Sequence, residues 1–92
     1  MKTIIMFHGR ECPHCQAMLL IVDKLIKEGI NIEKLEVWHD EKNAKAMREY
    51  SEVIKKACGG DLGVPVFVDK ENNRAICGET SYSALKEWIG KE

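Results

Sequence analysis

The sequence predicts a single α/β domain spanning residues 1–92, in which a mixed four-stranded sheet is flanked by helices. Three observations predict this class: short apolar runs rich in β-branched residues, longer segments with apolar residues at helical spacing, and a short polar connection between the last two strands. The predicted order is strand, helix, strand, helix, strand, strand, helix. A chain of 92 residues is long enough for one core and too short for a second domain.

The first half of the chain is typical of a strand–helix–strand unit. Residues 3–7 form a continuous apolar run, which indicates a strand covered on both faces. Residues 13–28 place apolar side chains along one helical face, and Gly29 is suited to end that helix. Residues 32–38 alternate as a second strand. Because the connection is long enough to hold a helix, these two strands are expected to be parallel.

The second half predicts a long helix, a hairpin and a final helix. Residues 40–58 have apolar side chains at helical spacing, and a glycine pair follows them. Two short apolar strands, 64–68 and 74–77, flank a polar connection that favours an antiparallel hairpin. Thr80 or Ser81 is suited to cap the last helix.

Charge and hydropathy argue against nucleic-acid and membrane functions. The 14 basic and 15 acidic residues nearly cancel, and no run of Lys or Arg forms a phosphate-binding stripe. The apolar runs are too short for a signal peptide or a membrane span. We therefore expect a cytoplasmic monomer with no nucleic-acid or membrane partner.

The chemistry-bearing motif is Cys12-Pro13-His14-Cys15. Cys12 lies where a buried strand leads into a helix, and Pro13 occupies the first turn, where its missing N–H costs nothing. The positive end of the helix favours the thiolate of Cys12, which predicts that Cys12 is the nucleophile. Cys15 lies one turn further on and is expected to be the more buried, resolving thiol. His14 is placed to stabilise the thiolate, which would make the disulfide more oxidising.

The position of this dithiol, together with Gly63-Val64-Pro65 at a hairpin strand and Cys77-Gly78 before the last helix, resembles the thioredoxin and glutaredoxin superfamily. The resemblance covers essentially the whole chain, and the compact order of elements is most similar to glutaredoxin-like proteins. It implies a thioredoxin-like fold and a thiol-disulfide oxidoreductase that carries electrons to protein disulfides. The redox-active group would be the Cys12–Cys15 disulfide itself, with no metal and no other cofactor.

The same resemblance implies how substrate is held. Pro65 would be a cis proline packed beside the dithiol, and the backbone of Val64 would pair with an extended substrate segment. Gly78 would belong to the same binding surface, and Cys12 would be exposed to solvent.

Three positions argue against glutathione as the reductant. Glutaredoxins usually carry Lys three residues before the first cysteine, Thr two residues before the cis proline, and Asp soon after a glycine pair, and all three serve glutathione. The corresponding positions here are Gly9, Gly63 and, approximately, Glu79-Thr80. We therefore expect weak or absent use of glutathione, with a flavoprotein reductase of the thioredoxin type as the electron donor.

A metal-binding module remains the alternative from a different class. The C-x-x-C spacing also occurs in zinc and iron–sulfur sites. His8 and His14 lie close enough in sequence to complete a Cys2His2 zinc site, although four ligands within so few residues would strain the helix start.

The remaining candidate residues have simpler interpretations. Cys58 and Cys77 are most simply small core residues, although Cys77 would end its strand near Pro65 and is also a candidate third redox thiol. Trp38 is interpreted as a packing residue, and Asp40 as a helix cap.

Overall fold

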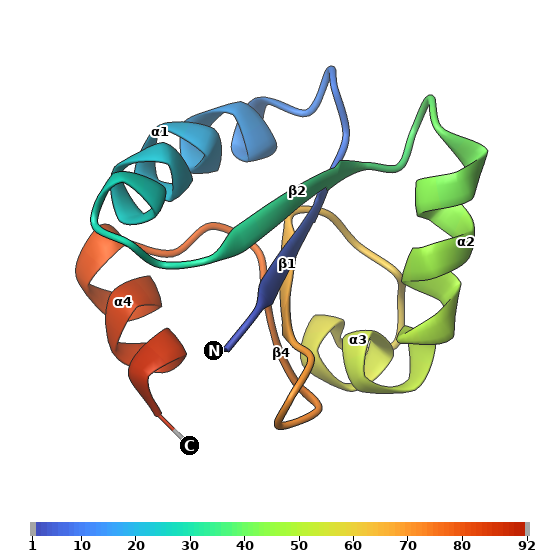
Figure 1. The fold of residues 1–92 in the computed structure, drawn as a ribbon. Helices are drawn as coiled ribbons and strands as arrows, with labels where there is room; N and C mark the ends of the chain where they lie inside the picture. The colour runs from blue at the N-terminus through green and yellow to red at the C-terminus, as the bar shows by residue number, and fades with distance from the viewer. Residues whose placement is uncertain (1, 92) are drawn as a thin grey trace.

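The computed structural model, which describes residues 2–91, confirms the predicted α/β class and order of elements, with one additional helix (Figure 1). The elements are β1 (Ile4–His8), α1 (Pro13–Lys27), β2 (Ile32–Glu36), α2 (Glu41–Glu49), α3 (Ser51–Cys58), β3 (Val66–Asp69), β4 (Arg74–Cys77) and α4 (Tyr82–Gly90). The sheet has the strand order β2-β1-β3-β4. β1 is parallel to β2 and antiparallel to β3, and β3 is antiparallel to β4, so the mixed four-stranded sheet is confirmed.

Helices cover both faces of the sheet. Figure 1 shows α1 and α4 on one side and α2 and α3 on the other. Along β1, Ile4 and Met6 pack into the core beneath α1 and α4, whereas Ile5 and Phe7 pack into the core beneath α2 and α3. The apolar run of β1 is therefore continuous because both of its faces are buried.

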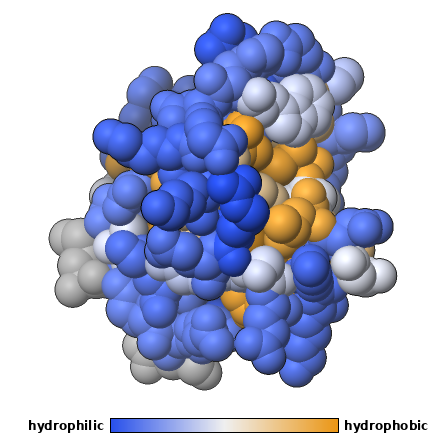
Figure 2. All heavy atoms as spheres, turned by 90° about the vertical axis from the view of Figure 1, so that its right-hand side faces the viewer, coloured by the Kyte–Doolittle hydropathy of each residue, from blue (hydrophilic) through white to orange (hydrophobic). Residues whose placement is uncertain are grey.

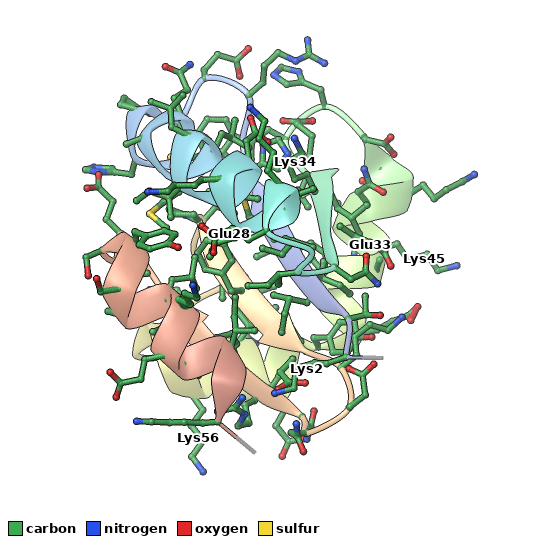
Figure 3. The ribbon with its side chains drawn as sticks, turned by 60° about the vertical axis from the view of Figure 1, so that its left-hand side comes forward. Lys2, Glu28, Glu33, Lys34, Lys45 and Lys56 are labelled. Carbon is green, nitrogen blue, oxygen red and sulfur yellow. A yellow bond between two sulfur atoms is a disulfide. The ribbon has the colours of Figure 1, made fainter. Side chains whose placement is uncertain are left out.

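Apart from the buried Asp69, the charged residues among residues 2–91 reach the outer surface of these layers. Figure 3 shows Lys45 and Lys56 pointing away from the fold. Between elements, Lys34 of β2 pairs with Asp23 of α1 at 2.8 Å. Within residues 2–91, no helix combines the length and apolar character needed to cross a membrane.

The segment predicted as one helix over residues 40–58 is two helices, so that prediction is wrong at Tyr50. Tyr50 leaves the helical conformation, with φ −106° and ψ 15°. Met47 of α2 and Ile54 of α3 both enter the same core, and the Tyr50 ring lies 6.2 Å from the Phe7 ring. The bend lets both helices pack on the twisted sheet, and it occurs without a glycine or proline to mark it.

The outer ends of this segment agree with the prediction. The Asp40 carboxylate accepts hydrogen bonds from the backbone N–H groups of Lys42 and Asn43, and is the N-cap of α2. Gly59 ends α3 in the left-handed conformation, with φ 79°, which a residue without Cβ adopts at little cost. Of the two candidate caps of α4, Ser81 is the one that accepts from the helix, through the N–H of Ala84.

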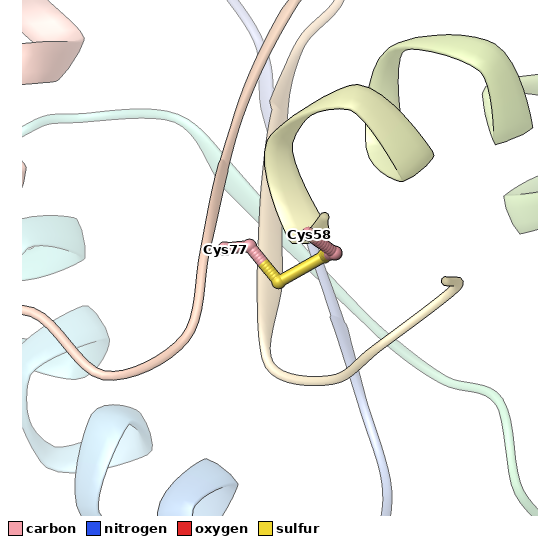
Figure 4. The surroundings of a disulfide bond; sticks show 2 residues. All are labelled: Cys58 and Cys77. Atoms are coloured by element: carbon pink, nitrogen blue, oxygen red, sulfur yellow. A yellow bond between two sulfur atoms is a disulfide. The ribbon is translucent and has the colours of Figure 1, made fainter. Parts of the chain in front are cut away.

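Cys58 and Cys77 form a disulfide that joins the end of α3 to the end of β4 (Figure 4). The interpretation of both as separate core thiols is therefore wrong, and Cys77 is not a free third thiol in this structure. Both belong to the core side that faces α2 and α3, away from α1. They are 19 residues apart in sequence and 5.3 Å apart between Cα atoms, because the hairpin ends β4 beside the last turn of α3.

This disulfide is expected to stabilise the fold by about 3 kcal/mol, because it closes a loop of 19 residues in the unfolded chain. The double variant Cys58→Ala/Cys77→Ala should lower the free energy of unfolding in urea by about that amount. The matched control is Cys12→Ser/Cys15→Ser, which keeps the disulfide and should lose stability only when a reductant is added. An unfolding midpoint of that control that does not respond to reductant would contradict the prediction.

Candidate active site

Cys12 is the N-cap of α1, and Pro13 is the first residue of the helix, as predicted. The Sγ of Cys12 accepts a hydrogen bond from the backbone N–H of Cys15 at 3.3 Å. This contact joins the sulfur to one of the unpaired amides at the positive end of the helix. The expectation that Cys12 is exposed is wrong, since only 5% of the residue is accessible. Its capping role turns the sulfur back against the first turn of the helix and away from solvent.

Cys15 is fully buried, as predicted for the resolving thiol. Its burial, together with the contact with Cys12, raises the pKa of the thiol to about 12. The backbone N–H of Gly9, which donates to the Cys15 Sγ at 3.5 Å, acts in the opposite direction and lowers that pKa. Cys15 therefore keeps its proton at neutral pH.

A groove beside the dithiol collects the predicted substrate-binding residues. It has a volume of about 440 Å³ and is lined by His14, Val64, Pro65, Gly78 and Glu79. The Val64–Pro65 peptide bond is cis, as the family resemblance implied. The backbone N–H of Gly78 donates to the carbonyl oxygen of Pro65 at 2.8 Å, which ties the end of β4 to this loop.

An apolar patch lies on the side of the molecule that carries α2 and α3. Figure 2 views the side of the molecule that carries α2 and α3, and it shows an apolar patch within a largely hydrophilic surface. Half-buried apolar residues packed on this side of the sheet include Val37, Leu62 and Val64. Of these residues, Val64 also lines the groove.

Glu79 is a groove residue that the sequence analysis did not identify as functional. Its carboxylate pairs with Nδ1 of His14, and both side chains are at least half exposed. Glu79 directly follows Gly78, at the end of the strand that turns back toward Pro65. This position in the sequence is the signal that could have identified Glu79 as a groove residue. The pair brings one basic and one acidic side chain to the mouth of the groove.

His14→Ala is expected to make the Cys12–Cys15 pair more reducing, because the variant lacks an imidazole that can stabilise the thiolate of the reduced form. A tenfold change in the redox equilibrium constant corresponds to about 30 mV, and we expect a shift of about that size. The potential is measured by equilibrating the protein with a thiol redox buffer. Glu79→Gln is the matched control, since it keeps His14 and removes only its partner's charge. An unchanged potential in His14→Ala would assign the thiolate's stability to the helix terminus alone.

The zinc-site alternative finds no support in the arrangement of side chains. His14 turns to Glu79, and the Nδ1 atom of His8 is buried without a hydrogen-bond partner. Burial lowers the pKa of His8, with Glu36 opposing and Lys34 adding to that effect. Among residues 2–91, no three His, Cys, Asp or Glu side chains gather closely enough to hold a metal ion.

A second loop lies against the residues that precede Cys12. The Trp38 side chain covers Gly9 so closely that a Cβ atom at position 9 would lie 2.3 Å from the indole ring. The interpretation of Trp38 as a packing residue is thus correct, although 52% of it remains exposed. In the same loop, His39 pairs with Glu11 through its Nε2 at 2.6 Å.

Comparisons with known proteins identify the fold. No protein-family model and no curated protein sequence matches the chain. Among solved structures, a glutaredoxin from Archaeoglobus fulgidus is 24% identical, with a TM-score of 0.66 over 99% of this chain and 89% of that one. Methanoredoxin from Methanosarcina acetivorans is 18% identical, with a TM-score of 0.67 over 97% of this chain and 85% of that one.

Desulfothioredoxin from Desulfovibrio vulgaris Hildenborough, in its reduced form, is 22% identical, with a TM-score of 0.59 over 94% of this chain and 76% of that one. At these identities the comparisons concern architecture rather than particular residues. Together with the strand order β2-β1-β3-β4 and the helices on both faces, they show that this chain has a thioredoxin-like fold.

Proposed function

We propose that this protein is a thiol-disulfide oxidoreductase, which exchanges the Cys12/Cys15 dithiol with protein disulfides through a mixed-disulfide intermediate. The observation that carries the proposal is the difference between the two thiols. The Cys12 sulfur accepts a hydrogen bond from an unpaired amide in the first turn of a 15-residue helix, whereas burial raises the pKa of Cys15 to about 12. Cys12 is therefore the thiol that attacks first, and Cys15 stays protonated until the second displacement.

The reaction divides into two displacements. The Cys12 thiolate attacks one sulfur of the substrate disulfide, forms a new S–S bond and releases the other substrate sulfur as a thiolate, which takes up a proton. Cys15 then gives up its proton and attacks the Cys12 sulfur, which releases the second substrate thiol. Two electrons and two protons pass to the substrate, and Cys12 and Cys15 end as a disulfide. His14 assists by stabilising the Cys12 thiolate.

Substrate binds along the groove beside the dithiol. The pairing of β3 with its neighbours begins at Val66, so the backbone of Val64 lies outside the ladder. We propose that this backbone pairs with an extended segment of the substrate, in the manner of an added strand. Pro65 and Gly78 line the same groove, together with His14 of the C-x-x-C motif.

The proposed partners follow from the same site. They are protein disulfides as substrates and a flavoprotein reductase as the electron donor. We propose that the protein acts in the cytoplasm as a monomer, in electron transport and redox homeostasis. The dithiol itself is the redox group, and no further cofactor, nucleic acid or membrane partner is part of the proposal.

We expect the flavoprotein reductase to support much faster turnover than glutathione. Gly9, Gly63 and Thr80 have no charged side chain with which to hold glutathione. Losing one hydrogen bond to a charged group costs about 1.5–3 kcal/mol, which is roughly tenfold or more in affinity.

The test measures reduction of a disulfide-bonded protein with each donor, and with dithiothreitol as a donor that needs no recognition. Efficient turnover that saturates at low glutathione would overturn the choice of donor. Absence of any reduction with dithiothreitol would overturn the proposed function.

A further inference from the structure

Gly9 contacts both cysteines through its backbone. Its carbonyl oxygen accepts the N–H of Cys12 at 3.1 Å, and its N–H donates to the Sγ of Cys15 at 3.5 Å. Gly9 is itself buried. The geometry of the dithiol therefore depends on where the loop of residues 9–11 lies.

The carboxylate of Glu36, at the end of β2, fixes that loop. One oxygen accepts the backbone N–H of Arg10 at 2.9 Å and that of Trp38 at 3.1 Å. The other oxygen accepts the N–H of His39 at 2.8 Å. One side chain thus joins the loop before the dithiol to the loop that follows β2.

The indole of Trp38 adds a steric contact to the same loop. A Cβ at Gly9 would lie 2.3–2.6 Å from three atoms of the ring, so only glycine lets the ring approach this closely. The ring is therefore packed against Gly9, whose N–H donates to the Cys15 sulfur. It restricts movement of Gly9 toward the side on which the ring lies.

We propose that Glu36 and Trp38 are positioning residues of the redox reaction: they hold Gly9 so that its N–H stays on the Cys15 sulfur when that sulfur carries negative charge. The inference rests on the proposed function and assigns residues to its second displacement. Neither residue lines the substrate groove or belongs to the C-x-x-C motif.

The physical reason is the cost of ionising a buried thiol. Cys15 must become a thiolate before it can attack, and burial opposes this. The Gly9 N–H is a hydrogen bond that favours the charged form. A loop that moved away from Cys15 would remove this hydrogen bond just when the negative charge develops.

Several charged groups surround Glu36, and the test must separate their titration from that of Cys15. Its burial raises the pKa of the carboxyl, but the three backbone N–H groups, and to a smaller extent the charge of His39, lower it. His8 of β1 and Lys34 of β2 also face this region. Because Glu36 is already ionised at neutral pH, its own titration does not enter the pH range of the test.

The experiment follows a reduced protein mixed with an aromatic disulfide that releases a coloured thiolate. The first release reports attack by Cys12, and the second reports resolution by Cys15, so a stopped-flow trace separates the two steps.

The variants are Glu36→Gln, Trp38→Ala and Trp38→Phe. Glu33→Gln is the matched control, because Glu33 is on the same strand and exposed. Gln offers a single uncharged acceptor oxygen, so it cannot accept all three N–H groups as the carboxylate does, and the hydrogen bonds that it keeps lose their charge-assisted strength.

For Glu36→Gln and Trp38→Ala we expect the second release to slow about five- to tenfold, while the first changes by less than about twofold, since one hydrogen bond to a charged atom is weakened. The pH profile of the second release should move to higher pH. Trp38→Phe should recover most of the rate, and Glu33→Gln should match the wild type.

A second release with unchanged rate and pH profile in both variants would overturn the inference, as would an equal slowing in Glu33→Gln. If the wild-type protein itself shows no first release, the proposed function fails instead. The two failures are therefore distinguishable in one experiment.

Discussion

Cys12→Ser is expected to abolish the reduction of protein disulfides, whereas Cys15→Ser should accumulate mixed disulfides with substrates. A serine hydroxyl at position 12 cannot replace the thiolate that begins the exchange. Cys15→Ser keeps that thiolate but lacks the thiol that releases the bound substrate. The measurement is turnover of a disulfide-bonded protein, followed by mass analysis of the protein under non-reducing conditions.

Alkylation at pH 7 tests the same assignment without a substrate. Because burial raises the pKa of Cys15, very little of this thiol is ionised at that pH, and only the thiolate reacts. The single thiol of Cys15→Ser should therefore be alkylated far faster than that of Cys12→Ser. Cys58→Ser/Cys77→Ser is the control that shows whether the other cysteines contribute. Faster modification of Cys15 than of Cys12 would reverse the two roles.

The order of elements could be predicted because local signals and chain connectivity agreed. The apolar run of residues 3–7 is buried on both faces of the sheet, and Ser81 caps the last helix as a hydroxyl should. The mixed sheet followed from one long connection and one short one. The groove could be predicted from the resemblance, and it brings His14 and Pro65 together.

The features that could not be predicted all depend on tertiary contacts. The break at Tyr50 arises where two helices pack on a twisted sheet, and the apolar periodicity runs through it without interruption. The Cys58–Cys77 disulfide requires knowing that α3 and β4 end side by side. The contact of Trp38 with Gly9 joins two loops distant in sequence, and sequence spacing alone contains no information about it.

Asp69→Ala is expected to lower the free energy of unfolding by about 3–5 kcal/mol, the usual cost of removing one partner of a buried ion pair. Asp69, at the end of β3, is fully buried. Its carboxylate accepts from Arg74 at 2.8 Å and lies 3.4 Å from the Nζ atom of Lys2, which Figure 3 shows beside the sheet. The backbone N–H and side-chain amide of Asn72 supply two further hydrogen bonds.

The effect should extend to the end of α4, which has no basic residue in its own last turn. The two cations that Asp69 holds also donate to carbonyl oxygens there: Arg74 to Trp88 and Lys91, and Lys2 to Ile89 and Lys91. Cations at a helix C-terminus are stabilising because they oppose its dipole. Without the carboxylate, two positive charges remain together and partly buried, which weakens both contacts.

The pKa of this carboxylate predicts how the stability of the fold depends on pH. Burial raises the pKa of Asp69, but the hydrogen bonds from Arg74, Asn72 and Lys2 outweigh it and lower the pKa from 3.8 to about 2. Because the folded-state pKa is the lower one, the contribution amounts to roughly 2 kcal/mol, is fully present above about pH 4 and is lost as the pH falls through about 2. Urea unfolding at a series of pH values measures it. Asp69→Asn keeps the size of the side chain and loses its charge. The stability of this variant should therefore fall less steeply between pH 4 and 2 than that of the wild type. Parallel curves for the two proteins would show that protonation of Asp69 is not linked to unfolding.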